Sequence, residues 1–267
     1  LISYLVEKSR VVKTSKGERG YHIFYQLCKG ASKEQVEALS LEDYKEFNYL
    51  KKGECFDVDD VDDVEEFKKV CASMLKCGIQ EETQSKMFAA LAAILHLGNI
   101  QFEEKEGGTG ENDYGVVSSS STKSLNVAAI LLGINPKVLQ ESLSQRTMGG
   151  GRGSVYKIPL QCKSCMDSRD ALCKEMYSML FAWLIHTINA TMASKSTPKN
   201  FIAVLDIFGF EVFEQNSFEQ LCINYANEVL HQQFIHHYFK LEQEEYATEG
   251  LNVEVLQIDQ VLSLIHI

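Results

Sequence analysis

The stretch FIAVLDIFGFEVFEQNSFEQLCINYANE, residues 201–228, decides what fold the chain is expected to have. Residues 201–207 are apolar apart from Asp206 and partly β-branched, which is typical of a strand buried on both faces of a mixed or parallel sheet. Gly209 and Glu211 follow Asp206 at the spacing Asp-x-x-Gly-x-Glu. Because α/β sheets bind their ligands beyond the carboxyl ends of the strands, the sequence predicts an α/β fold with these three residues at that edge.

The three residue types suit a sensor of nucleotide phosphate. Asp206 can hold a water molecule on Mg²⁺, and Glu211 can pair with a cation across a cleft. Gly209 has no Cβ, so its backbone N–H can approach a phosphate oxygen closely. A strand that simply ends in a turn explains the same spacing, since Asp-x-x-Gly is common by chance.

A long helix is predicted directly after this loop. From Ser217 to about Tyr246 the chain has no Pro or Gly, and apolar residues recur along it. At 1.5 Å per residue this segment would be a rod of roughly 45 Å. A phosphate-sensing loop joined to such a rod would act as a lever, although a long helix can equally be a scaffold of the core.

These two segments together carry a family resemblance. DIFGFE (residues 206–211) followed by NSFEQLCINYANE (residues 216–228) resembles switch II and the relay helix of the myosin motor domain. Kinesins and GTPases share Asp-x-x-Gly-x-Glu, but the residues that fill this spacing and the continuation are typical of myosins. The resemblance extends from residue 1 to about residue 251.

The resemblance implies a mostly α-helical piece of the P-loop NTPase motor fold that myosins share with kinesins, with helices around strands of a central mixed sheet. Residues 1–200 would contain the transducer strand and the upper actin-binding region, and residues 201–251 the switch II strand, its loop and the relay helix. Residues 252–267 diverge from the family. The last six, LSLIHI (residues 262–267), equal one reading frame of a widely used sequencing adaptor and are expected to be an artefact.

Two features lead us to expect a fragment. The chain starts at Leu1 without an initiator Met, inside an apolar-alternating segment, residues 1–12, that is predicted to be a strand. In the family the phosphate-binding loop and switch I precede that strand, and no Gly-x-x-x-x-Gly-Lys-Ser/Thr is found in the sequence. Since catalysis of phosphoryl transfer rests on positioning and electrostatics, the chain by itself is expected to be inactive.

The function that the resemblance implies for the intact protein is actin-activated hydrolysis of ATP with Mg²⁺, coupled to movement along actin filaments. Asp206 would lie near the water shell of the metal, the Gly209 N–H would touch the γ-phosphate, and Glu211 would pair with an arginine of switch I. Relay residues are expected to carry the closing of the loop to the lever arm; they are Asn216, Phe218 and Asn224.

The resemblance also implies partners and a location. The partners are the actin filament, calmodulin-like light chains on a neck outside this chain, and a membrane only through a tail outside it. The location is the cytoplasmic actin cytoskeleton. Two alternatives stay open: an inactive, actin-binding pseudo-motor, and another switch-containing NTPase such as a kinesin, which would bind tubulin.

The glycine-rich segment GGGRGS, residues 149–154, is the second informative stretch. By composition it is a loop, and the resemblance places it at the tip of the upper actin-binding region. In myosins one position of this loop, sixteen residues before the aspartate that corresponds to Asp170, is acidic or phosphorylatable, and here it is Ser154. Arg152 resembles the recognition residue of heavy-chain kinases of class I myosins. A phosphate would add about −1.5 to −2 charge units facing actin.

Composition and charge argue against a nucleic-acid-binding protein and against a membrane-spanning one. The formal net charge of −11 disfavours nucleic acid as a partner, and no apolar run approaches the length of a membrane span. The eight cysteines are expected to be reduced. Cys162-x-x-Cys165 suggests zinc or redox chemistry, but a single pair without a nearby His makes a metal site improbable.

An acidic run, DVDDVDDVEEF from Asp57, resembles a calcium loop at first sight. Calcium is disfavoured because Asp62 occupies the position where an EF-hand needs Gly, so the run is predicted to be the cap and first turn of a helix that ends at Lys76. Other segments are predicted from periodicity and from breaker residues: helices over residues 18–27, 81–97, 135–145 and 167–192, and a mobile loop over residues 103–121.

Overall fold

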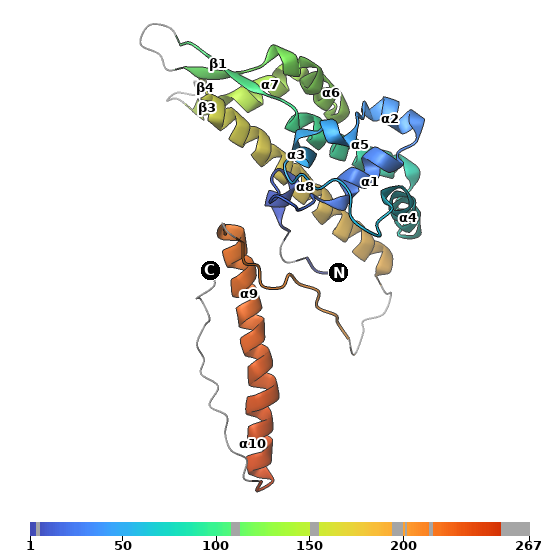
Figure 1. The fold of residues 1–267 in the computed structure, drawn as a ribbon, viewed down its shortest axis with the longest axis vertical. Coiled ribbons are helices and arrows are strands. Elements are labelled where there is room, and N and C mark those ends of the chain that lie inside the picture. The colour runs from blue at the N-terminus through green and yellow to red at the C-terminus, as the bar shows by residue number, and fades with distance from the viewer. Residues whose placement is uncertain are drawn as a thin grey trace. The chain divides into compact units, whose positions relative to one another are not determined.

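The chain folds into two compact units, residues 1–195 and residues 196–267 (Figure 1). The computed structural model describes residues 1–3, 6–107, 113–149, 155–193, 200, 202–213 and 216–251.

Unit 1 is mainly helical. Its α-helices are α1 (His22–Gly30), α2 (Lys33–Leu39), α3 (Asn48–Lys51), α4 (Asp63–Lys76), α5 (Glu81–Gly98), α6 (Thr122–Leu132), α7 (Pro136–Ser144) and α8 (Cys162–Met192). Short 3₁₀ helices are η1 (Lys8–Val11), η2 (Tyr44–Glu46) and η3 (Ser119–Ser121). None of the helices in the described part of the chain combines the length and apolar content that crossing a bilayer requires.

Helix α5 is the centre of the unit 1 core. It contacts α6 and α8 along its sides, and α1, α3 and α4 also pack against it (Figure 1). From Met87 to Gly98 nearly every side chain is buried, with Ile94 and Leu95 fully so. A helix that is apolar on all sides belongs inside a protein. Gly98 lets α3 approach closely, because a Cβ there would lie 2.6 Å from the ring of Tyr49.

A polar network joins α8 to this core. The Tyr49 hydroxyl donates to Oδ1 of Asp170 at 2.6 Å, and the Arg169 guanidinium donates to the same oxygen and to the Ile100 carbonyl at 2.8 and 2.6 Å. Burial raises the pKa of the Tyr49 hydroxyl, which keeps it protonated as the donor. The network fixes which turn of α8 faces α3 and α5.

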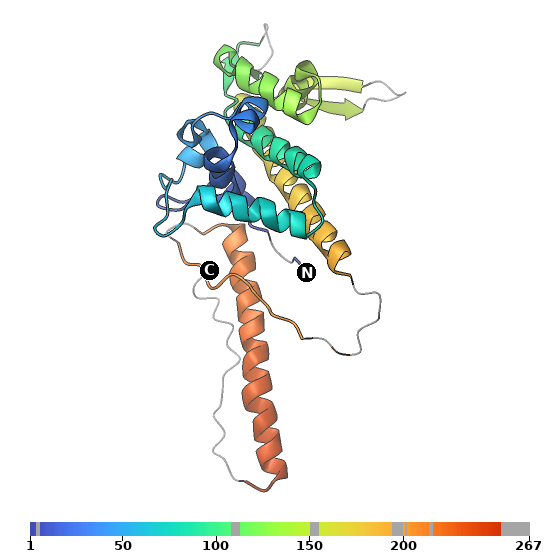
Figure 2. The ribbon, with the colours of Figure 1, turned by 90° about the vertical axis from the view of Figure 1, so that its right-hand side faces the viewer.

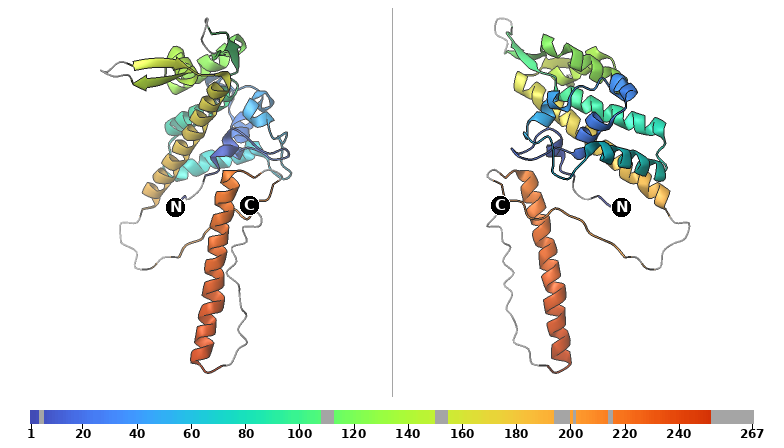
Figure 3. Two further views of the ribbon diagram at one scale, coloured as in Figure 1. Left: turned by 90° about the vertical axis from the view of Figure 1, so that its left-hand side faces the viewer. Right: turned by 45° about the vertical axis from the view of Figure 1, so that its right-hand side comes forward.

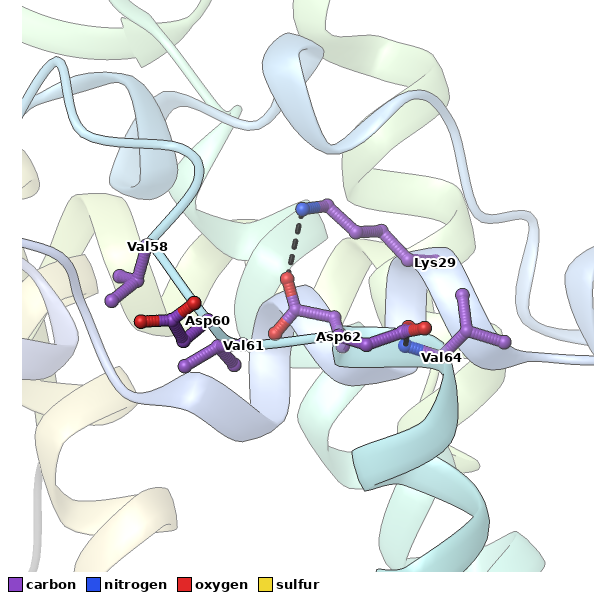
Figure 4. A pocket seen from close by; sticks show the side chains of 7 residues that line it. Lys29, Val58, Asp60, Val61, Asp62 and Val64 are labelled. Atoms are coloured by element: carbon purple, nitrogen blue, oxygen red, sulfur yellow. Dashed lines mark hydrogen bonds and ion pairs between the residues drawn. The ribbon is translucent and has the colours of Figure 1, made fainter.

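The acidic run behaves as predicted from the sequence. Asp62 caps α4, since its Oδ1 accepts from the backbone N–H groups of Val64 and Glu65 at 3.0 and 3.2 Å. A shallow pocket of about 510 Å³ lies over residues 58–64, and Lys29 reaches across it to Oδ2 of Asp63 at 2.8 Å (Figure 4). No group of three or more possible metal-ligating side chains is found among the described residues.

The loop predicted for residues 103–121 is partly wrong. The described residues contain an antiparallel hairpin, β1 (Phe102–Lys105) with β2 (Tyr114–Val117), followed by η3. Phe102 and Val117 are paired opposite each other and pack against the core, and this burial stabilises a hairpin that composition alone does not reveal. Residues 108–112 of the predicted loop lie outside the described part.

A second hairpin is formed by β3 (Gln145–Gly149) and β4 (Val155–Pro159), with Gln145 opposite Pro159. The strands flank the glycine-rich segment, whose residues 150–154 lie outside the described part. Both hairpins contact α7 or the beginning of α8 at one end of unit 1 (Figures 1 and 2).

Both strands predicted for a central sheet are absent from the described residues. Residues 8–11 form η1 instead, and residues 202–207 have no regular secondary structure, with Ile202 and Val204 almost fully exposed. A strand needs a neighbour to accept and donate its backbone hydrogen bonds. In the described chain the two sheets are separate two-stranded hairpins, so nothing pairs with either segment.

Unit 2 contains the predicted long helix. It runs as α9 (Phe218–Ile235), a π-helical stretch η5 (His236–Lys240) and α10 (Leu241–Thr248), without a break in the ribbon (Figure 3). Its apolar side chains are largely exposed; examples are Phe218, Tyr225, Phe234 and Tyr238. The sequence prediction of a rod starting after Ser217 is confirmed.

Lowering the pH below about 6.5 is expected to destabilise the chain through His96. This side chain is 2% exposed, its Nε2 lies 3.1 Å from the Leu39 carbonyl, and burial lowers its pKa despite nearby Glu42. The neutral ring is therefore the donor. Below the unfolded-state pKa of about 6.5 the unfolded chain binds a proton that the folded chain does not, so the free energy of unfolding falls by at most about 1.4 kcal/mol per pH unit.

Urea unfolding followed by circular dichroism between pH 7.5 and 5 measures this slope. His96→Gln is the control, because an amide can still donate to the Leu39 carbonyl but does not titrate. We expect this variant to have a shallower slope than the unchanged chain. Equal slopes for the two proteins would show that His96 is not the titrating group.

Candidate functional site

The first two residues of the predicted Asp-x-x-Gly-x-Glu site are exposed. The side chain of Asp206 has no hydrogen-bond partner among the described residues, and a Cβ added at Gly209 would meet no atom within 4 Å. The close approach expected of Gly209 therefore has no protein neighbour within the described chain. Both positions are open to a ligand or to another part of a longer protein.

Glu211, by contrast, is held by the helix. Its backbone N–H donates to Oδ1 of Asn224 at 2.8 Å, and Nδ2 of Asn224 donates back to its carbonyl at 2.8 Å. Asn224 is 3% exposed and lies in the second turn of α9. One side-chain amide thus satisfies both backbone groups of the loop residue, as a neighbouring strand would, and ties the loop to the helix.

Gln220 adds a second link, which the sequence reasoning missed. Its Nε2 donates to Oε2 of Glu211 at 3.3 Å, and its Oε1 accepts from the backbone N–H of Ser217 at 2.9 Å. Ser217 precedes the first residue of α9, so Gln220 both caps the helix and orients the glutamate. The spacing Ser-x-x-Gln is the capping-box pattern and was the available signal.

The side chain of Asn216 likewise forms two hydrogen bonds with the backbone of one loop residue, Phe213. It accepts from the Phe213 N–H at 3.0 Å and donates to the Phe213 carbonyl at 3.3 Å. Of the three predicted relay residues, Asn216 and Asn224 therefore contact the loop backbone. Phe218 does not join them, because its side chain is 74% exposed.

The carboxylates of Asp206 and Glu211 are the side chains at this site that could contribute to binding Mg²⁺. This ion keeps several waters and is held in proteins by one or two carboxylates together with substrate phosphates, not by a cage of side chains. Asp206 offers one exposed carboxylate without a competing partner in the described residues, which fits that requirement. No cation pairs with Glu211 within the described chain, so its expected arginine partner has no counterpart there.

The predicted regulatory residues, Arg152 and Ser154, lie outside the described residues. Both residues belong to the segment of residues 150–154 that connects β3 to β4. Lys157 in β4 forms an ion pair with Glu141 in α7 at 2.5 Å, which ties the hairpin to the helix beside it.

Comparison with known proteins identifies the family. The model of the family described as myosin head (motor domain) matches residues 1–266. The chain belongs to the myosin motor-domain family, as the residues of the loop and helix predicted. This membership excludes the kinesin alternative.

Individual relatives agree with this assignment. The chain is 43% identical to Myosin-1 of Coprinopsis cinerea over 255 residues and 45% identical to Myosin-52 of Schizosaccharomyces pombe over 256 residues, in both cases over 94% of the chain. It is 43% identical to Myosin IE heavy chain of Dictyostelium discoideum over 273 residues, 99% of the chain. In its similarity to Myosin-1 and Myosin IE the chain is class I-like. It spans 19%, 16% and 27% of these three relatives.

Proposed function

We propose that these residues belong to an actin-based motor that couples the hydrolysis of ATP, with Mg²⁺, to movement along actin filaments. The observation that carries the proposal is the pair of 2.8 Å hydrogen bonds between Asn224 and the backbone of Glu211. A loop with the residues of a phosphate sensor is joined through a buried side chain to a helix that continues to Thr248. Movement of the loop must then move the helix, or break both bonds.

The roles of the loop residues follow from their chemistry. Asp206 would hold Mg²⁺ through water, and the ion would neutralise charge on the phosphates of ATP. The N–H of Gly209 would donate to the γ-phosphate, and a Cβ placed at Gly209 would meet no atom of the described chain within 4 Å. Glu211 would be oriented by Gln220 and Asn224 to meet a cation of switch I.

We further propose that Ser154 is a site of regulatory phosphorylation by a heavy-chain kinase, with Arg152 as part of its recognition sequence. The support is the sequence, in which residues 150–154 connect β3 to β4, and connecting segments often carry regulatory or binding residues. A phosphoserine there would add negative charge at the surface that meets actin.

The remaining partners and the location rest on family membership. Calmodulin-like light chains would bind a neck, and a membrane would be contacted through a tail, both outside this chain. The protein would act in the cytoplasmic actin cytoskeleton. The alternative of a pseudo-motor, which binds actin without turnover, predicts the same partners and is separated from the motor by measuring hydrolysis.

The experiment is an ATPase assay of the longer protein that includes the phosphate-binding loop and switch I, with and without actin filaments. Unmodified protein, kinase-treated protein, Ser154→Ala and Ser154→Glu are compared. We expect actin to stimulate the kinase-treated protein and Ser154→Glu strongly, and the unmodified protein and Ser154→Ala weakly.

Two results would contradict these proposals separately. Co-sedimentation with actin without any stimulated hydrolysis would identify the pseudo-motor. Equal stimulation of Ser154→Ala and Ser154→Glu, with normal turnover, would remove the phosphorylation switch and leave the motor proposal intact.

A further inference from the structure

Two cysteines lie in the first turn of α8. Cys162 is the first residue of this helix and is half-buried, and Cys165 is fully buried. The proposed motor function does not use either thiol. Among the described residues all eight cysteines are free, so both are available for chemistry.

The geometry of a helix start brings this pair close to bonding distance. Side chains three residues apart lie on the same face of a helix, with Cβ atoms about 5–6 Å apart, whereas a disulfide needs about 3.5–4.5 Å. The Cys165 N–H donates to the Gln161 carbonyl at 3.0 Å, which fixes this residue in the helical ladder. The N–H of the first residue of an α-helix has no acceptor within the helix, so Cys162 can shift towards Cys165 without breaking a hydrogen bond from its own N–H.

The sulfur atoms are held only by weak contacts. The Cys162 thiol donates to the Phe102 carbonyl at 3.4 Å, and the Cys165 thiol lies 3.9 and 3.8 Å from the carbonyls of Gly115 and Leu160. Thiols are weak donors, so losing these contacts opposes bond formation only slightly. Burial raises the pKa of the Cys165 thiol, which leaves half-buried Cys162 as the sulfur that meets a reagent first.

We propose that Cys162 and Cys165 form a reversible dithiol–disulfide pair that is oxidised by low-molecular-weight disulfides such as oxidised glutathione. The Cys162 thiolate attacks one sulfur of the reagent, which forms a mixed disulfide and releases one thiol. The Cys165 thiolate then attacks Sγ of Cys162, which forms the intramolecular bond and releases the second thiol. Two electrons and two protons leave the protein and convert the reagent to two thiols.

The pair lies where both hairpins join α8. Gly115 in β2 packs directly on it, because a Cβ at Gly115 would lie 2.8 Å from both Cys162 Cα and Cys165 Sγ. Leu160 links the same region: it accepts from the Gly115 N–H at 2.8 Å, and its own N–H donates to the Ser144 carbonyl at 2.9 Å. Closing the disulfide moves the first turn of α8 and therefore loosens these backbone contacts.

The test uses the 267-residue chain in buffers that range from fully reduced to fully oxidised glutathione. After free thiols are blocked, the chain is digested with trypsin without reduction. Trypsin cleaves after Lys163, between the two cysteines, so the disulfide joins peptide 158–163 to peptide 164–169. We expect this linked pair to form at a less oxidising glutathione ratio in the folded chain than in the same chain in urea.

Two sets of variants accompany the mapping. Cys162→Ser and Cys165→Ala should each abolish the linked pair, whereas the double variant Cys71→Ser/Cys77→Ser, which changes two half-buried thiols of the α4 region, should leave it unchanged. Hydrogen exchange of the unchanged chain should show amide exchange of Gly115 about tenfold faster after oxidation, because a backbone hydrogen bond is weakened by about 1.4 kcal/mol.

The proposal fails if oxidation gives only a glutathione adduct on Cys162, or links Cys162 or Cys165 to another cysteine. It also fails if the pair forms no more readily in the folded chain than in urea. Since the mapping is done on the unchanged chain, a variant that does not fold leaves the test valid.

Discussion

Asp63→Asn is expected to reduce the free energy of unfolding of the chain by about 3–5 kcal/mol, since it breaks a buried ion pair from one side. Oδ2 of Asp63 accepts from Arg19 at 2.5 Å and from Lys29 at 2.8 Å. The side chains of Asp63 and Arg19 are 2% and 5% exposed. Removing the carboxylate leaves the guanidinium buried without its counter-charge, and urea unfolding measures the loss.

Asp57→Asn is the matched control. Asp57 pairs with the same Lys29 at 2.6 Å, but its side chain is 72% exposed and its charge is screened by solvent, so its loss should destabilise the chain far less. Equal effects of the two substitutions would show that burial of the Asp63 pair does not matter.

The ion pairs of Asp63 with Arg19 and Lys29 also predict that the free energy of unfolding falls in acid. Burial alone would raise the pKa of Asp63, but the hydrogen bonds from Arg19 and Lys29 outweigh it and lower the pKa. This stabilisation is present above the unfolded-state pKa of about 3.9 and is lost as the pH falls below it.

Asn224→Asp is expected to release the loop from the helix. A carboxylate can still accept from the Glu211 N–H, but it has no hydrogen to donate to the Glu211 carbonyl and repels that oxygen. Leaving a buried group unsatisfied costs about 1–3 kcal/mol, which corresponds to roughly 5- to 150-fold faster exchange of the Glu211 amide. Hydrogen exchange with mass spectrometry on peptides that cover residues 207–213 measures this change.

Asn227→Asp tests whether the effect is specific. Asn227 lies one turn along the same helix, and within the described chain its side chain donates only to the Ile223 carbonyl of α9, at 3.1 Å. We expect exchange at Glu211 to be unchanged in this variant. If both substitutions accelerate exchange equally, fraying of the helix and not the loss of the link is responsible.

Local signals in the sequence predicted most of the helices. Asn135 before Pro136 gives the start of α7, and Asp62 before an acidic turn gives the start of α4. Helix α2 could have been predicted, because Ser32 and Gln35 form a capping box. Helix α8 begins at Cys162, five residues before the predicted start at Asp167. The prediction missed this start because Gln161, the residue before the helix, is not a typical capping residue.

Features that depend on distant partners were not predictable in this way. The hairpin β1–β2 forms in a segment with loop composition because Gly115 fits against the start of α8. The strand pattern of residues 201–207 is present in the sequence, but a strand forms only where neighbours supply hydrogen bonds. For the candidate site, the residue types were predictable, whereas the link from Asn224 to Glu211 spans thirteen residues and depends on how the loop folds back onto α9.

The π-helical stretch at His236–Lys240 changes what the long helix can present to a partner. Phe234 and Tyr238 contact each other at its beginning, with ring centroids 4.5 Å apart and ring planes tilted by 34°. A π turn accommodates one extra residue, so every side chain after it lies about 100° further around the axis than an uninterrupted α-helix would place it. Side chains of α10 therefore lie on a different side of the helix from where an uninterrupted α-helix would place them. Deleting one residue within the stretch is expected to restore an uninterrupted α-helix and to rotate α10 by about 100° about the helix axis.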